Sequence, residues 1–187
     1  MKYIEEFEKY VEMAGFKNVK IGSTEDFLEQ RAKTVRSVVA VQFFDARLIA
    51  TWEHLYFAVL NALTAFKNGV NISKSLAMEI LLFASAERQI RKATKLVGIK
   101  PSSSEIAVVL VDNQRSNLKS VCSEISTRVN GRHDDSVLDL SPNKVENLKK
   151  AFEISDLELE TAARKNSLRN GLINLVIERT ALLATQI

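Results

Sequence analysis

Four basic side chains in the middle of the chain have the spacing needed to bind a row of phosphate groups. They are Arg88, Arg91, Lys92 and Lys95. At about 100° per residue on an α-helix, this spacing places all four in one stripe. Lys74 falls on the same stripe, and few acidic residues stand at the i,i+4 positions that would neutralise it. Such a row suits a nucleic-acid backbone, and Gln89 beside it could hydrogen-bond a base.

An ordinary solvent-exposed helix face would also explain these charges. Cations near the end of a helix are favoured by the helix dipole.

The segment around the stripe is locally basic. Residues 71–100 carry six basic side chains against two acidic ones, an excess of four, which is larger than the net charge of +3 of the whole chain. The stripe has no aromatic residue, and Phe83 is expected to point away from it, so a single-stranded nucleic acid would need aromatic contacts from elsewhere. The residues alone leave both explanations open.

The residues that could carry out catalysis do not form a recognisable site. The chain has no GxxxxGK[ST] motif, no GxGxxG motif after a strand and no paired cysteines. His54 on an apolar helix suits a structural hydrogen bond, and His133, within GRHDDS, suits a solvated turn. Cys122 has no basic neighbour in sequence. Glu79 is predicted to project among apolar side chains, where it needs a structural partner. We predict a protein without enzymatic activity, metal or cofactor.

The elements that must position the basic stripe are predicted to belong to one domain over residues 1–187. The chain is 46% hydrophobic with two prolines, which suits one compact core. Sequence patterns predict strands over residues 10–21, 35–49, 106–111 and 136–140. They predict helices over residues 23–33, 51–66, 73–97, 115–128, 142–154 and 156–187. This order indicates an α/β (α+β) fold, with a single small, mostly antiparallel sheet surrounded by several helices.

Two details of these helices matter for the stripe. Thr51 is predicted to cap the helix over residues 51–66. Within the long helix over residues 73–97, a seven-residue repeat is predicted to face the core. Its members are Leu76, Phe83, Ile90 and Val97. The basic stripe would then run along the solvent side of one continuous helix for more than five turns.

The composition also indicates where the protein works. A single cysteine suits a reducing compartment. No stretch approaches the roughly 20 apolar residues that span a bilayer. The N-terminal sequence MKYIEEFEKY is acidic and lacks the apolar region of a secretory signal. We expect a cytoplasmic protein with no membrane partner.

The C-terminal helix carries two apolar stripes. The first consists of Leu168, Leu172, Leu175, Val176, Leu182 and Leu183. The second, roughly 120° away by helical geometry, consists of Ile173, Ile177, Ala184 and Ile187. A helix that is apolar on two sides is either deeply buried or packs one side on the core and offers the other to a partner.

Several segments together resemble the small kinase-binding subunit of the KEOPS (EKC) complex, the PRPK-binding protein family. They are EHLYFAVLNAL, NISKSLAMEILLFASAERQIRKA, HDDSVLDL and IERTALL. The resemblance extends over residues 10–183, and MEILLFASAERQI is its most specific part. The family has Ser-Gly-Gln before Arg-Gln-Ile, where this chain has Ser85, Ala86 and Glu87. We expect the loss of the glycine to be a mild change on a helix, and Glu87 to weaken the positive field slightly.

The resemblance implies a function. KEOPS makes the threonylcarbamoyl modification on adenosine 37 (t6A37) of tRNAs that read codons beginning with A. Another subunit performs the transfer, beside a Bud-type atypical kinase/ATPase. The family member binds the kinase N-lobe and supports its activity without catalysis of its own. In archaeal relatives it captures tRNA through the single-stranded 3′ CCA end, so an archaeal source is expected.

The resemblance also assigns roles to residues. Arg88, Gln89 and Ile90 match the family motif directly, and helical geometry adds the other basic residues. The candidate RNA-binding residues are Lys74, Arg88, Gln89, Arg91, Lys92 and Lys95. The candidate kinase-binding residues are Ile173, Ile177 and Ala184. Two alternatives stay open: a scaffold that binds and activates the kinase without touching RNA and, less favoured, an enzyme with Glu79, His54 or His133 in a pocket.

Overall fold

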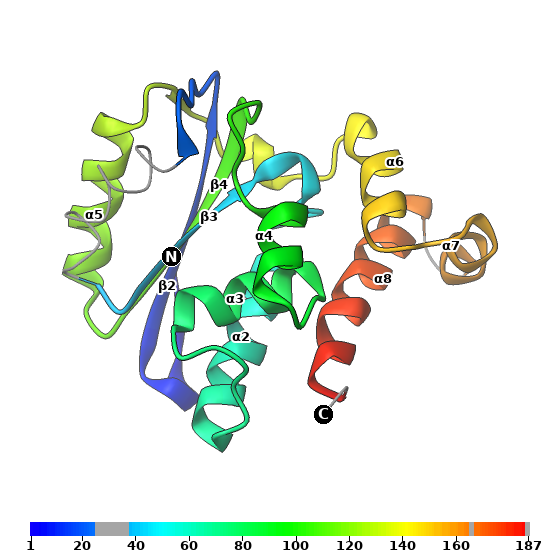
Figure 1. Cartoon of the computed structure of the whole chain (residues 1–187), viewed down its shortest axis with the longest axis horizontal. Coiled ribbons are helices and arrows are strands. Elements are labelled where there is room, and N and C mark those ends of the chain that lie inside the picture. Colours follow the sequence, from blue (N-terminus) through cyan, green and yellow to red (C-terminus); the bar gives the residue numbers. More distant parts are fainter. Residues whose placement is uncertain (25–37, 165–166, 186–187) are drawn as a thin grey trace. The chain divides into compact units, whose positions relative to one another are not determined.

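The computed structural model describes residues 1–24, 38–164 and 167–185, and these residues form two compact units (Figure 1). The first, called the sheet unit here, consists of Met1–Ala46 and Ile99–Val137. The second, the helical unit, consists of Arg47–Gly98 and Leu138–Ile187. The helix predicted over residues 23–33 falls largely on residues 25–37, outside the described part. Within the described residues, no helix is both long enough and apolar enough to cross a membrane.

The sheet unit is built on an antiparallel sheet with β4 (Glu105–Asp112) at its centre. The other strands are β1 (Lys2–Ile4), β2 (Lys9–Lys17), β3 (Ala40–Asp45) and β5 (Arg132–His133). The strand order is β1-β2-β4-β3, and β5 pairs with β2. The run IAVVLV suits β4 because β-branched residues fit a strand that is covered on both faces. The predicted α+β fold with a small, mostly antiparallel sheet is therefore confirmed.

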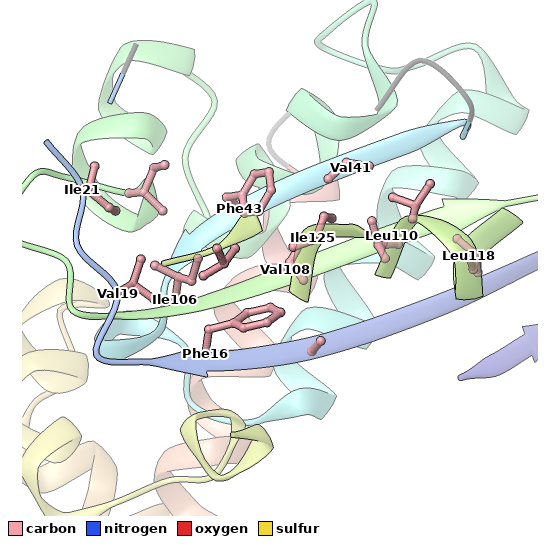
Figure 2. Close-up of a cluster of buried hydrophobic side chains, with 14 residues drawn as sticks. Phe16, Val19, Ile21, Val41, Phe43, Ile106, Val108, Leu110, Leu118 and Ile125 are labelled. Atoms are coloured by element: carbon pink, nitrogen blue, oxygen red, sulfur yellow. The ribbon is translucent and has the colours of Figure 1, made fainter. Parts of the chain in front are cut away.

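One helix of this unit, α5 (Arg115–Arg128), packs on the sheet through side chains spaced by three and four residues. Leu118 and Ile125 lie in one buried cluster with Val108 and Leu110 of β4 (Figure 2). Full burial of each such side chain contributes about 1.5–3 kcal/mol. The apolar spacing along α5 therefore fixes which face of the helix covers the sheet.

The GRHDDS sequence, called the GRHDDS turn here, contains β5 and the start of a 3-10 helix, and it is bound to β2. The Asp135 carboxylate accepts the Gly15 N–H at 2.9 Å, and the Asp134 N–H donates to the Gly15 carbonyl at 2.8 Å. Hydrogen bonds from Ser136, and then the nearby Lys17, hold the pKa of Asp134 well below its usual range. The strand predicted over residues 136–140 is wrong, because Asp135–Leu138 form a 3-10 helix. His133 itself lies in the strand β5 with an exposed side chain, so the turn predicted for it is wrong.

The helical unit contains six α-helices in the described residues. They are α2 (Trp52–Asn68), α3 (Leu76–Ser85), α4 (Ile90–Val97), α6 (Pro142–Ala151), α7 (Asp156–Ala163) and α8 (Leu168–Leu182). As predicted, the Thr51 side chain caps α2 by accepting the His54 N–H. α2 ends at Gly69, whose φ of 69° is left-handed. The predicted helix over residues 156–187 divides into α7 and α8, so that prediction is wrong as a single helix.

The single helix predicted over residues 73–97 is also wrong, because the chain breaks between α3 and α4 (Figure 1). Ala86 has a left-handed φ of 53°. Its N–H donates to the Phe83 carbonyl at 3.0 Å, and the Glu87 N–H donates to the Leu82 carbonyl at 3.1 Å. This pair of bonds is the Schellman ending of a helix, in which glycine is favoured at the left-handed position. The expectation that this alanine lies within a helix is therefore wrong.

Candidate functional site

The break separates the residues of the predicted basic stripe. Arg91, Lys92 and Lys95 lie on α4, while Arg88 and Gln89 lie in the break before it. Lys74 precedes α3, so it is not part of the same helix surface. The prediction of one continuous stripe is wrong, although all six candidate RNA-binding residues are exposed. What remains is a shorter cluster, which we call the basic break, consisting of Arg88, Gln89, Arg91, Lys92 and Lys95.

The helix α4 turns its basic side chains away from the protein core. Ala93 and Val97 are fully buried, and by helical geometry Arg91, Lys92 and Lys95 stand on the opposite side. Ile90, predicted to face the core, is 45% exposed, so that prediction is wrong. Ile90 is the first residue of α4, because α3 ends at its C-cap Ala86 and the next helix begins after Gln89.

The first turn of α4 adds to the positive field of these side chains. It contains no acidic residue, and the side chain of Gln89 at the N-cap makes no capping hydrogen bond. The first N–H groups of a helix have no partner within it and carry a partial positive charge. The start of α4 beside Arg88, Arg91 and Lys92 is therefore suited to an anion such as a phosphate.

A pocket of about 300 Å³ adjoins the basic break. Its walls come from α2, the loop after α2, α3, the break and the 3-10 helix Leu183–Thr185. The lining residues are Asn61, Thr64, Ala65, Asn68, Val70, Ile72, Glu79, Phe83, Arg88, Leu183 and Ala184. Ligand sites commonly combine such apolar walls with a few polar groups. Phe83 is buried in the core, as predicted, and it also lines this pocket together with the exposed Arg88.

Glu79 holds the loop that forms one wall of this pocket. Its carboxylate accepts the Ile72 N–H at 3.0 Å and the Ser73 N–H at 2.7 Å. The side chain is fully buried, so these two bonds replace the water that a carboxylate would otherwise require. The prediction of a structural partner for Glu79 is confirmed.

His54 has a comparable structural task. The Ala50 N–H donates to its Nδ1 at 3.3 Å, and its Nε2 lies 2.8 Å from the Ala84 carbonyl oxygen. Burial lowers the pKa of His54 to about 4, so the ring is neutral near pH 7. The predicted structural hydrogen bond is confirmed, and it occupies both ring nitrogens.

The other residues considered for catalysis are also held in local contacts. His133 pairs with Asp135 at 3.1 Å. Burial is the main cause that raises the pKa of the Cys122 thiol, which disfavours the reactive thiolate. Among residues 1–24, 38–164 and 167–185, no three His, Cys, Asp or Glu side chains gather where they could hold a metal ion.

The two C-terminal apolar stripes run along α8 into the 3-10 helix Leu183–Thr185, and they differ in burial. In the first stripe, Leu172, Leu175, Val176 and Leu183 are buried, whereas Leu168 and Leu182 are 61% and 40% exposed. In the second stripe, Ile173 and Ile177 are half-buried and Ala184 is exposed. Ile173 packs in part against the apolar core of the helical unit. The second stripe therefore keeps some apolar surface outside the core, and Ile187 lies outside the described residues.

A second pocket, of about 450 Å³, is lined by residues of α6, α7 and α8, including Val145, Leu159 and Leu172. Lys149 on its wall is paired with Asp156 at 2.5 Å and with Glu146 at 3.3 Å. These carboxylates neutralise Lys149, and the exposed Arg169 also lines this pocket.

A family model for the kinase binding protein CGI-121 matches residues 16–184. The chain belongs to the CGI-121 family. This confirms the resemblance to a kinase-binding subunit that the sequence motifs indicated. The matched range contains the basic break, the pocket that adjoins it and three residues of the second stripe, Ile173, Ile177 and Ala184.

Two curated relatives carry the Cgi121 name. The chain is 33% identical over 113 residues to the regulatory protein Cgi121 of Methanocaldococcus jannaschii, a match that covers 60% of this chain and 70% of the relative. It is also 33% identical over 76 residues to the KEOPS complex subunit Cgi121 of Pyrococcus abyssi. That match covers 41% of this chain and 44% of the relative, so it spans less than half of either protein.

The sequence analysis missed the pocket of this CGI-121 family member, although one signal for it was present. Asn61 and Asn68 are seven residues apart, so they share one face of a helix that is rich in apolar residues. Both line the pocket. Polar amides on an apolar helix indicate a site where a ligand or a loop needs hydrogen bonds.

Proposed function

We propose that this chain is a non-catalytic regulatory subunit of a KEOPS complex, which makes t6A37 in tRNA. In this proposal it binds the Bud-type kinase/ATPase and captures tRNA through the single-stranded 3′ CCA end. The family's kinase-binding description and the relative named as a KEOPS subunit support the assignment. The two archaeal relatives support an archaeal source, and we propose a cytoplasmic location.

The observation that carries RNA capture is the joint position of the basic break and the pocket. Arg88 belongs to both. Phosphates of the RNA would bind Arg88, Arg91 and Lys92 at the start of α4, which releases counterions and makes affinity depend on salt. An adjoining base would then reach the pocket without any movement of the phosphate-binding residues.

The pocket favours an unpaired base over a duplex. A volume of about 300 Å³ has room for one nucleotide residue and not for a base pair in a helix. Phe83 and the aliphatic lining residues offer apolar contact to a base face, and Asn61 and Asn68 offer amide donors and acceptors to its edge. A free 3′ end supplies unpaired bases next to a phosphate chain.

Kinase binding is proposed for the second stripe of α8, at Ile173, Ile177 and Ala184. Replacing Ile177 with Asp should weaken binding to the kinase because it places a charge on a half-buried apolar surface. Replacing Leu157, which is 71% exposed on α7, with Asp is the matched control. If Ile177→Asp unfolds the protein, the stripe is core and this assignment is wrong.

The test of RNA capture measures binding to intact tRNA and to the same tRNA lacking CCA, at two salt concentrations. Arg88→Glu/Arg91→Glu should abolish the CCA-dependent binding. Arg115→Glu/Lys119→Glu changes the charge equally on the exposed face of α5 and should leave it intact. Binding that is insensitive to CCA or to the first pair would contradict RNA capture. Loss of kinase binding alone would favour the scaffold that does not touch RNA.

A further inference from the structure

The end of α3 contains a buried carbonyl group that the helix itself does not satisfy. In a continuous helix, the carbonyl of Ala84 would accept the N–H of residue 88. The chain leaves the helix at Ala86, and the Ala84 carbonyl instead lies 2.8 Å from His54 Nε2. Ala84 is fully buried, so water does not serve this carbonyl. His54 supplies the hydrogen bond that the missing helical turn would have made.

The surroundings of His54 fix it as a donor to this carbonyl. Because the Ala50 N–H donates to Nδ1, the proton of the neutral ring is on Nε2. Thr51 caps the helix on which His54 stands, and the ring of Phe152 contacts the imidazole edge-on with centroids 5.5 Å apart. The lowered pKa keeps the ring neutral near pH 7, so the donor and acceptor roles are stable.

The break itself is finely balanced because its left-handed residue is alanine. A side chain with a Cβ disfavours the left-handed conformation that Ala86 adopts. Extending α3 through residue 88 would relieve that conformation and would satisfy the Ala84 carbonyl from within the helix. Such an extension would also move Arg88 and Gln89 onto helical positions away from the start of α4.

We propose that His54 is a positioning residue that holds the break between α3 and α4, and thereby presents Arg88 and Gln89 beside the pocket. Because His54 already donates a hydrogen bond to the Ala84 carbonyl, a continuous helix would not gain a hydrogen bond to that carbonyl. His54 acts from α2, 30 residues earlier in the chain. The proposal rests on the proposed function only where RNA binding is the readout.

Two substitutions at position 54 separate its two hydrogen bonds. His54→Asn keeps an acceptor near Nδ1 for the Ala50 N–H but is too short to donate to Ala84. His54→Gln carries an amide donor at the reach of Nε2. Ala86→Gly favours the left-handed conformation independently of His54. If His54 positions the break, Ala86→Gly should compensate for His54→Asn.

The experiment follows the full chain by NMR, using backbone carbon shifts of residues 84–89, together with tRNA affinity. His54→Asn should shift residues 86–88 toward helical values and weaken tRNA binding several-fold. His54→Gln, and His54→Asn combined with Ala86→Gly, should both restore the shifts of the break and the affinity.

Unchanged shifts in His54→Asn would overturn the proposal, as would a folded double variant that does not recover them. If His54→Asn alone does not fold, Ala86→Gly is compared with the double variant His54→Asn/Ala86→Gly instead. If the double variant loses the shifts of the break while Ala86→Gly keeps them, glycine does not compensate for the loss of His54, and the proposal is overturned. If the wild-type chain binds no tRNA, the proposed function fails, while the shifts still decide the role of His54.

Discussion

The GRHDDS turn of the sheet unit and the basic break of the helical unit are both rich in charge, but they use it differently. In the turn, Asp134 pairs with Arg132 at 3.0 Å and with Lys17 at 3.4 Å, and Asp135 binds the backbone of Gly15. On α4, Arg91, Lys92 and Lys95 make no ion pair within the part of the chain that the structure describes.

The difference separates charges that build the fold from charges that are available to a ligand. Short exposed ion pairs contribute little each, but in the turn they act with backbone hydrogen bonds and tight packing. Arg91, Lys92 and Lys95 of the basic break instead lie in solvent, where they contribute little to stability and strengthen the field toward an anion. Changes in the turn should therefore alter stability, whereas changes in the break should alter binding.

The largest effect is expected from Gly15→Val in the turn. A Cβ at this position would overlap Val137 Cγ2 and would lie 2.7 Å from the Asp134 carbonyl oxygen. The clash with backbone should reduce the free energy of unfolding by about 3 kcal/mol or prevent folding. Gly22→Ala, where nothing lies within 4 Å, is the control. Urea unfolding that is alike for both variants would contradict the structural role of the turn.

An effect of comparable size, confined to low pH, is expected from the titration of His54. Burial lowers the pKa of His54 from its ordinary value of 6.5 to about 4. Between these values the unfolded chain binds a proton that the folded chain does not, so the free energy of unfolding falls as the pH falls. The loss should reach about 3 kcal/mol at pH 4 and be absent above pH 6.5.

The measurement compares urea unfolding of the wild type and of His54→Gln at several pH values between about 7 and 4. The difference between the two proteins should change across this range, since glutamine does not titrate. The pKa of Glu158 is lowered to about 2 by the hydrogen bond from the Ser155 backbone and by Arg179. Both proteins contain Glu158, so its titration does not contribute to the difference between them. A constant difference would show that His54 is not a buried neutral group.

A smaller effect is expected when two cations of the break are removed. Arg91→Ala/Lys92→Ala should lower the slope of log affinity for tRNA against log salt by about 2. The free energy of unfolding should change by no more than about 0.5 kcal/mol, because both side chains are exposed. Arg115→Ala/Lys119→Ala on α5 should leave the slope unchanged. A slope unaltered by the first pair would place the RNA phosphates elsewhere.

The smallest effect is expected from Ala86→Gly. Glycine removes the strain of the left-handed φ of 53°, which should stabilise the protein by about 1 kcal/mol. Gly69→Ala is the mirror control, because Gly69 has a φ of 69° and nothing within 4 Å of an added Cβ. It should destabilise by a similar amount. Equal midpoints of thermal unfolding for Ala86→Gly and the wild type would remove the argument that the break is strained.

Local signals were enough to predict much of the fold. The strand β4, the helix α2 with its Thr51 cap and the α+β class follow from residue patterns within a few turns of chain. The break between α3 and α4 carries no proline or glycine, and its apolar repeat continues through Ile90. It depends on a hydrogen bond from His54, 30 residues away, which no local pattern contains.

The candidate site divides in the same way. The basic residues were predictable because a cluster of arginine and lysine is recognisable from the sequence, whether or not one helix continues through it. The pocket was not, because its walls come from α2, the loop after it, α3 and the 3-10 helix Leu183–Thr185. Bringing Asn61, Phe83 and Ala184 to one cavity requires the tertiary fold.

The central claim is that the basic break and its adjoining pocket receive an RNA 3′ end, and titration of the labelled full chain with a CCA trinucleotide tests it most directly. The NMR shifts should change at the side-chain amides of Asn61 and Asn68 and at the backbone of residues 86–92. Changes centred on the second pocket around Val145 and Leu172, or on the sheet unit, would contradict the claim, as would the absence of any change at saturating trinucleotide.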